Sequence, residues 1–103
     1  MAWFGIRTVY LFGVKANDIN VFEERVICIE AADSDEAHEK AKLEAEKYAL
    51  ANGFERYPIQ IAYEQDGTSL VDGYEVWSEL FESKLSLSEF WVMRYESYEY
   101  KPE

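Results

Sequence analysis

The sequence has few of the residues from which most enzyme and metal sites are built. It holds one histidine, His38, and one cysteine, Cys28, among 103 residues. A single cysteine cannot form an intramolecular disulfide, and one histidine without a second imidazole or a thiolate beside it does not make a soft metal site. The glycines are spread singly along the chain, so there is no glycine-rich loop for a phosphate group. Carboxylates are so numerous that no single pair stands out as a catalytic pair. We therefore expect a non-enzymatic protein with no catalytic residues, no metal and no cofactor.

Long apolar runs are also missing. No stretch approaches the roughly 20 apolar residues of a membrane-spanning helix, and the first residues (MAWFGIRTVYLFGV) lack the features of a signal peptide. These absences predict a cytoplasmic protein that does not enter a membrane. Hydrophobic residues make up 49% of the chain and aromatic residues 17%, which argues against disorder. A length of 103 residues predicts a single domain spanning residues 1–103.

Positive charge is scarce. The chain has 21 acidic residues against 10 basic ones, which gives a formal net charge of −11. Such a charge repels nucleic acid and anionic lipid and attracts a basic protein partner. The same charge is also compatible with a simpler role, which is to keep the protein in solution. Charge alone leaves both interpretations open.

Residues 33–52 (DSDEAHEKAKLEAEKYALAN) predict the principal helix. Asp33 and Glu36 are spaced as a capping box, and Gly53 supplies the residue that ends the helix. A stripe of mostly small side chains follows helical spacing and predicts close packing on a sheet: Ala37, Ala41, Ala45, Tyr48 and Asn52. His38 is expected at the boundary of this stripe. On the opposite line, Leu43 and Leu50 predict either a homodimer contact or a loop lying over them.

Four strands are predicted from alternating or β-branched and aromatic segments, at 3–12, 21–31, 59–64 and 74–82. Cys28, within the run VICI of the second strand, is expected to be a small buried side chain. The order β-β-α-β-β predicts an α+β fold in which an antiparallel sheet of about four strands carries one long helix on one face. In the tail, residues 86–98, Ser86 and Glu89 form a second capping box and favour a short C-terminal helix, while the run FWVM also allows a strand.

Four motifs occur in a fixed order along the chain. They are WFGIR at 3–7, FEER at 22–25, an alanine-rich helix that begins DSDEA at 33–37, and DGYEVWS at 72–78. Over residues 3–82 the chain resembles a family of short acidic bacterial proteins known only as a domain of unknown function. The resemblance implies no activity and no catalytic residues. In size and acidity the chain is also similar to the immunity proteins that are encoded beside bacterial toxins.

The fourth predicted strand supplies a candidate binding surface. One parity of this strand is expected to point away from the helix, beside Trp3 and Arg7 if the strands are neighbours: Glu75, Trp77, Glu79 and Phe81. Aromatic side chains between carboxylates fit a surface that recognises a basic protein. The alternative is that the aromatic residues of the tail fold back over them and form a second small core. The start of the helix offers another candidate surface, at Asp35, Glu36 and Glu39.

Two functions from different classes follow. The first is an acidic binding protein, most concretely an immunity protein that neutralises a cognate bacterial toxin, for instance a nuclease, by occluding its cationic site. The second is a housekeeping structural or regulatory module of unknown partner, homodimeric through Leu43 and Leu50. Neither function requires a cofactor.

Overall fold

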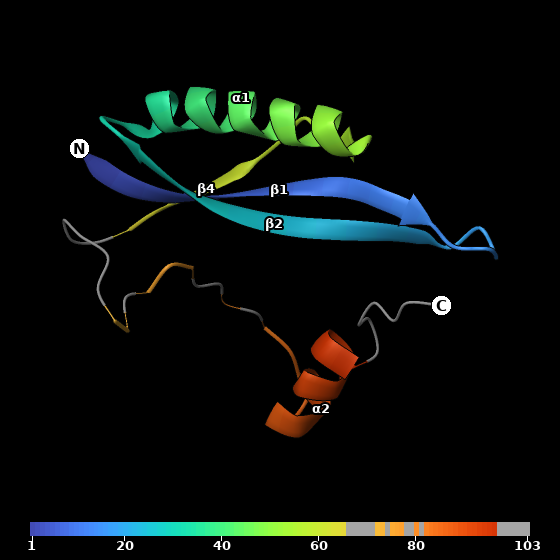
Figure 1. The fold of residues 1–103 in the computed structure, drawn as a ribbon. Helices are drawn as coiled ribbons and strands as arrows, with labels where there is room; N and C mark the ends of the chain where they lie inside the picture. Colours follow the sequence, from blue (N-terminus) through green and yellow to red (C-terminus); the bar gives the residue numbers. More distant parts are fainter. Residues whose placement is uncertain (66–71, 74, 78–79, 81, 97–103) are drawn as a thin grey trace.

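In its described part, the protein is an antiparallel four-stranded sheet with one long helix packed on one face (Figure 1). The computed structural model describes residues 1–65, 72–73, 75–77, 80 and 82–96. The elements in chain order are β1 (Ala2–Val14), β2 (Asn20–Ala31), α1 (Ser34–Asn52), β3 (Glu55–Arg56), β4 (Ile61–Glu64), α2 (Leu87–Trp91) and the π-helical turn η1 (Val92–Glu96). The predicted α+β class, its β-β-α-β-β order and its long helix are confirmed.

Strand β1 is the centre of the sheet. It pairs antiparallel with β2 along nearly its whole length, with one register shift between Leu11 and Gly13. Its other edge pairs antiparallel with β4 at Phe4 to Arg7 and with β3 at Tyr10 and Leu11. Among the described strands, β2 therefore lies at one edge of the sheet, and the two short strands share the other edge.

The predicted strand at 74–82 is wrong in its described part. Residues 75–77, 80 and 82 belong to no strand, and the short β3 after the helix takes the remaining place in the sheet. The reason is that residues 75–77 lie over the face of the sheet instead of along its edge. An alanine Cβ built on Gly5 would stand 3.0 Å from the carbonyl oxygen of Val76.

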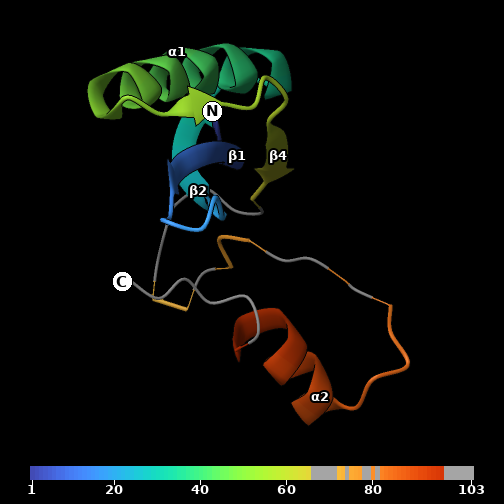
Figure 2. The same cartoon turned by 90° about the vertical axis from the view of Figure 1, so that its right-hand side faces the viewer.

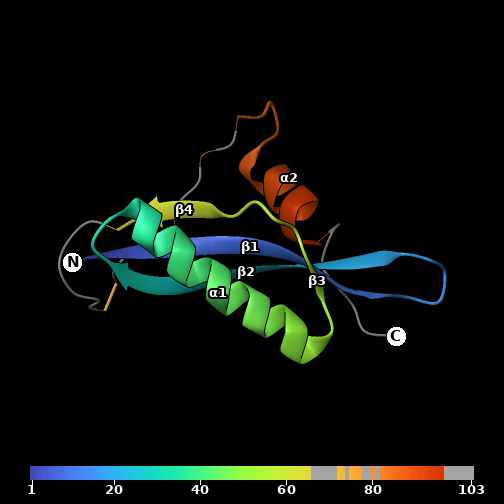
Figure 3. The same ribbon diagram turned by 90° about the horizontal axis from the view of Figure 1, so that it is seen from above.

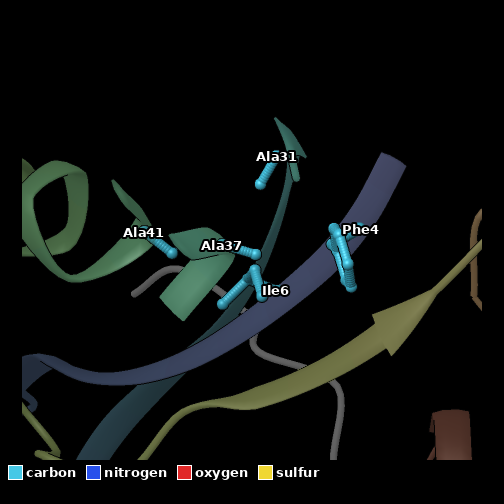
Figure 4. Packing of buried hydrophobic residues seen from close by; sticks show 5 residues of the cluster. All are labelled: Phe4, Ile6, Ala31, Ala37 and Ala41. Atoms are coloured by element: carbon cyan, nitrogen blue, oxygen red, sulfur yellow. The ribbon is translucent and has the colours of Figure 1, made fainter. Parts of the chain in front are cut away.

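Helix α1 begins and ends where its sequence predicts. The Asp33 carboxylate accepts a hydrogen bond of 2.8 Å from the backbone N–H of Glu36, and Gly53 ends the helix with a φ of 70°. Seen from above, α1 lies diagonally across β1 and β2 (Figure 3). It docks through alanines, of which Ala37 and Ala41 are fully buried beside Ile6 (Figure 4).

One part of the predicted stripe is corrected. The fourth buried position is Ala49, while Tyr48 is half-buried and Asn52 is exposed with its side-chain amide donating to the Tyr48 carbonyl. Residues spaced four apart from Ala37 face the sheet along the whole length of this helix. Around Ala49 a second cluster forms, in which the rings of Tyr10 and Tyr48 meet edge to face at 5.0 Å.

The expectation of a buried Cys28 is also wrong. Side chains alternate along β2, and those facing α1 are the odd-numbered ones, such as Ile27 and Ile29. Cys28 points to the other face, where it is exposed. Val26 and Cys28 are therefore exposed on the face of the sheet opposite α1, although the apolar run VICI suggests that they are buried.

The C-terminal part lies on the far side of the sheet from α1 (Figures 1 and 2). Ser86 and Glu89 form the predicted capping box, so the helical interpretation of the tail is confirmed for α2 and η1. The hydrogen bonds from Ser86 to the Glu89 carboxylate lower the pKa of that group. Within the residues that the structure covers, no helix combines the length and hydropathy needed to cross a membrane.

Candidate functional site

The predicted site residues fall on two sides of the molecule. Trp3, on β1, alternates with Phe4 and so faces away from α1, as do Glu75 and Trp77, which pack on that face of the sheet. Asp35, Glu36 and Glu39 lie on α1, on the other side. The structure therefore does not bring the two sets together. Glu79 and Phe81 lie outside the described residues.

Trp77 lies over the sheet at Gly5. A Cβ on Gly5 would come within 3.1 Å of Cε3 of the indole, so only glycine leaves room for this close approach. The Arg7 guanidinium lies 4.9 Å from the centre of the Trp77 ring, and the Tyr63 ring lies 5.8 Å away. Trp77 therefore does lie beside Arg7, but through packing over the face of the sheet and not through the neighbouring strand on which the prediction depended. Because Trp77 is half-buried in these contacts, it fixes its own segment to the sheet.

Polar contacts complete the attachment of residues 75–77. The Tyr63 hydroxyl donates a hydrogen bond of 2.6 Å to the Glu75 carboxylate, which remains exposed. Gln65 is only 3% exposed, and its side-chain amide donates to the Val76 carbonyl at 3.3 Å. Its Oε1 is buried and has no hydrogen-bond partner among the residues that the structure describes. Glu75 is thus held in place at the surface by the tyrosine of β4.

The polar contacts on the helix side hold α1 to β2. The Arg25 guanidinium donates two hydrogen bonds, of 2.8 and 2.7 Å, to the Glu44 carboxylate and lies over the Tyr48 ring at 3.8 Å. This pairing raises the pKa of Arg25 above its ordinary value. The Tyr48 hydroxyl donates to Glu23 at 2.7 Å, which raises the pKa of Tyr48. These groups stabilise the interface between α1 and the sheet, so they are not available to a partner.

At the start of α1 the carboxylates are open to solvent. Asp35 and Glu39 are exposed, and Glu36 pairs with Lys40 at 3.2 Å one turn later. His38 is half-buried at the edge of the helix, as predicted, and its Nδ1 and carbonyl oxygen lie 3.0 and 2.8 Å from the Gln60 amide nitrogen. In the described part of the chain, no group of three or more histidine, cysteine or acidic side chains is placed to hold a metal ion.

The face of the sheet opposite α1 also presents residues that were not predicted as site residues. Phe22 is 63% exposed on this face, and Val26 and Glu24 share its parity along β2. Alternation in VFEERVICIE is the signal that could have identified them, because it places even-numbered residues together on one face. Because the long helix was expected to cover only one face of the sheet, exposed apolar side chains on the other face, such as Phe22 and Val26, indicate a binding surface.

Comparison with known proteins identifies a family without identifying an activity. No curated protein and no solved structure matches the chain. The family described as Domain of unknown function (DUF4288) matches residues 3–65. Apart from Ala2 at the start of β1, this span includes the four described strands and α1, and it ends before the DGYEVWS motif that the sequence resemblance over 3–82 included. Since the match covers more than half of the chain, the protein belongs to the DUF4288 family.

Proposed function

We propose that this protein is a non-enzymatic acidic binding protein that inhibits a basic protein partner in the cytoplasm. In its most concrete form it is an immunity protein that neutralises a cognate bacterial toxin, for instance a nuclease. The observation that carries the proposal is a net charge of −11 combined with a sheet face, opposite α1, on which carboxylates alternate with exposed apolar side chains. This combination fits recognition of a cationic protein surface, since it supplies both attraction and area to bury.

The arrangement of this face supports contact with protein and disfavours other partners. Phe22 and Val26 are exposed on β2, with Glu24 between them and Glu30 further along. Glu75 extends the acidic surface onto the segment that packs over β1. Nucleic acid and anionic lipid would be repelled by the net charge, whereas a basic protein would be drawn in.

The mechanism is occlusion. A nuclease must attract phosphate groups, so its active site is cationic, and an acidic surface can occupy that site without undergoing reaction. Occlusion requires a rigid surface, because ordering a flexible one would consume part of the binding free energy. The close docking of α1 through Ala37 and Ala41, together with the Arg25–Glu44 pair, gives the sheet this rigidity. No cofactor takes part.

Co-expression tests the proposal. The product of the gene immediately upstream is expressed in bacteria alone, together with this protein, and together with a variant in which Glu24 and Glu75 are replaced by lysine. We expect the upstream product to arrest growth, the wild-type protein to restore it, and the charge-reversed variant to restore it poorly although it still folds. An upstream product that is harmless, or that stays toxic beside the wild-type protein, contradicts the proposal.

A second function rests on a separate observation. Leu43 and Leu50 lie on the outer face of α1 and are 66% and 87% exposed. Two large apolar side chains on one line of a helix fit a contact between two copies of the chain, as in a homodimeric structural or regulatory module. This contact lies on the opposite side of the sheet from the acidic face, so the two functions are distinguishable by mutation.

A further inference from the structure

A shallow hollow of about 210 Å³ lies on the sheet face opposite α1, at the end where β1, β2 and β3 meet. Its lining includes Val9 and Leu11 from β1, together with Phe22, Glu55 and Tyr57. Leu11 stands directly opposite Phe22 on one side and Glu55 on the other, so these three side chains form one row across the strands. The floor of the hollow is therefore aliphatic, and its rim carries two aromatic rings and a carboxylate.

A second row completes the rim. Val9 stands opposite Glu24 on β2, and its carbonyl oxygen accepts a hydrogen bond of 2.9 Å from the backbone N–H of Tyr57. In the first row the aromatic ring, of Phe22, lies on β2 and the carboxylate, of Glu55, lies on β3. In the second row the carboxylate, of Glu24, lies on β2 and the aromatic ring, of Tyr57, follows β3. The two aromatic rings, of Phe22 and Tyr57, thus occupy diagonal corners, and the two carboxylates, of Glu24 and Glu55, occupy the others. All four side chains at the corners reach solvent.

This arrangement has the chemistry of a site for a long cationic side chain. Aliphatic stems pack on apolar floors, and a guanidinium can lie on an aromatic face while its N–H groups reach carboxylates. Glu24 and Glu55 are separated by two strand spacings across the sheet and by two residues along the strands. Strand geometry therefore places their Cα atoms about 12 Å apart. That separation leaves room for one guanidinium between the two carboxylates.

The chain's own Arg94 provides independent support. This arginine comes from η1, on the same side of the sheet, and its Nη2 lies 3.9 Å from the Glu24 carboxylate. One corner of the hollow therefore already attracts a guanidinium from a segment distant in sequence. The pair is partly exposed, so it exchanges with a competing cation at little cost.

We propose that this hollow, lined by Val9, Leu11, Phe22, Glu55 and Tyr57 and flanked by Glu24 on β2, is a docking site for an arginine side chain of a basic protein partner. The inference rests on the proposed function and specifies which part of the acidic face makes the central contact. The arginine stem packs on the aliphatic floor, its guanidinium stacks against the aromatic corners, and the two carboxylates neutralise its charge. Arg94 competes for Glu24, so the unbound protein partly covers its own site.

The test uses a defined probe. The full chain, labelled with ¹⁵N, is titrated with the peptide acetyl-Gly-Arg-Gly-amide, and separately with its citrulline twin, which has nearly the same shape without the charge. We expect saturable amide shifts concentrated at residues 9–11, 22–24 and 55–57 with arginine, and at least threefold weaker binding with citrulline. Glu55→Gln and Phe22→Ser should each weaken arginine binding at least threefold. Arg94→Gln should strengthen it, because Glu24 is released.

A matched control is Glu39→Gln, which removes one exposed carboxylate from the α1 side and should leave the titration unchanged. Equal binding of the citrulline peptide overturns the docking site, as does a lack of shifts at the hollow. Shifts that centre on Asp35 and Glu39 also overturn it, and they count against the sheet face as the binding surface. The co-expression test does not depend on the peptide, so rescue that requires Glu24 and Glu75 would leave the proposed function standing without the docking site. Failure of the co-expression test together with specific arginine binding at the hollow would contradict the proposed function alone.

Discussion

Replacing Ala41 with leucine tests how α1 is held on the sheet. Ala41 has no exposed surface and packs with Ile6, Phe4 and Ala31 in the same cluster (Figure 4). A leucine here has three further carbon atoms and no space for them, because the helix lies close to the strands. Overpacking of this kind costs about 1–3 kcal/mol of the free energy of unfolding. For a domain of this size, a loss of 2 kcal/mol lowers the melting temperature by roughly 10 °C.

The matched control is Ala51→Leu, which makes the same chemical change on the same helix at an exposed position. Alanine and leucine have similar helix propensities, so this variant should stay within about 0.5 kcal/mol of the wild type. Urea denaturation followed by circular dichroism measures both. If Ala41→Leu is as stable as Ala51→Leu, the alanine stripe does not dock the helix, and the rigidity invoked for the binding face has no basis.

Three further results are expected. Gly5→Ala should lower the free energy of unfolding by about 1–3 kcal/mol in urea denaturation, because the new Cβ would lie 3.0 Å from the carbonyl oxygen of Val76. Unchanged stability would show that residues 75–77 do not pack over Gly5. If Leu43 and Leu50 form a homodimer seam, replacing both with glutamine should halve the mass measured by sedimentation, whereas a wild-type monomer at high concentration removes that idea. The pKa of Tyr48 is raised in the folded protein, so its contribution to stability is present below pH 10 and is lost as the pH rises through the folded-state pKa. In alkaline denaturation the wild type should therefore lose more stability than Tyr48→Phe. Equal losses would show that the hydrogen bond from Tyr48 to Glu23 is unimportant.

The sequence predicts those parts of the fold that depend on local spacing. Asp33 and Gly53 define the ends of α1 because capping is decided within a few residues. Alternation along β1 places Phe4 and Ile6 on the same face of the strand, and that face packs against α1. The same reasoning fails at Cys28, because an apolar run of four residues hides which parity faces the core.

The sequence does not predict contacts that depend on where distant segments meet. The DGYEVWS motif has the alternation of a strand, yet Trp77 packs over Gly5, and the described residues 75–77 cover a face of the sheet instead of extending its edge. A glycine in a strand allows either outcome, and the sequence does not say which segment approaches it. The hollow near Leu11 is even harder to predict from the sequence, since it depends on the strand register that places Phe22 and Glu55 on either side of Leu11. Register across three strands is set by the whole sheet.

The central claim is that the acidic sheet face attracts and covers a basic protein. Its most direct test is the association rate with the upstream gene product, measured by stopped-flow fluorescence at low and high salt, for wild type, Glu24→Lys, Glu75→Lys and the α1 control Glu39→Lys. Electrostatic steering predicts a rate constant that falls at least tenfold with salt. It also predicts slower association for the two sheet-face variants and little change for the control. A wild-type rate that does not respond to salt, with all three variants alike, would contradict the claim.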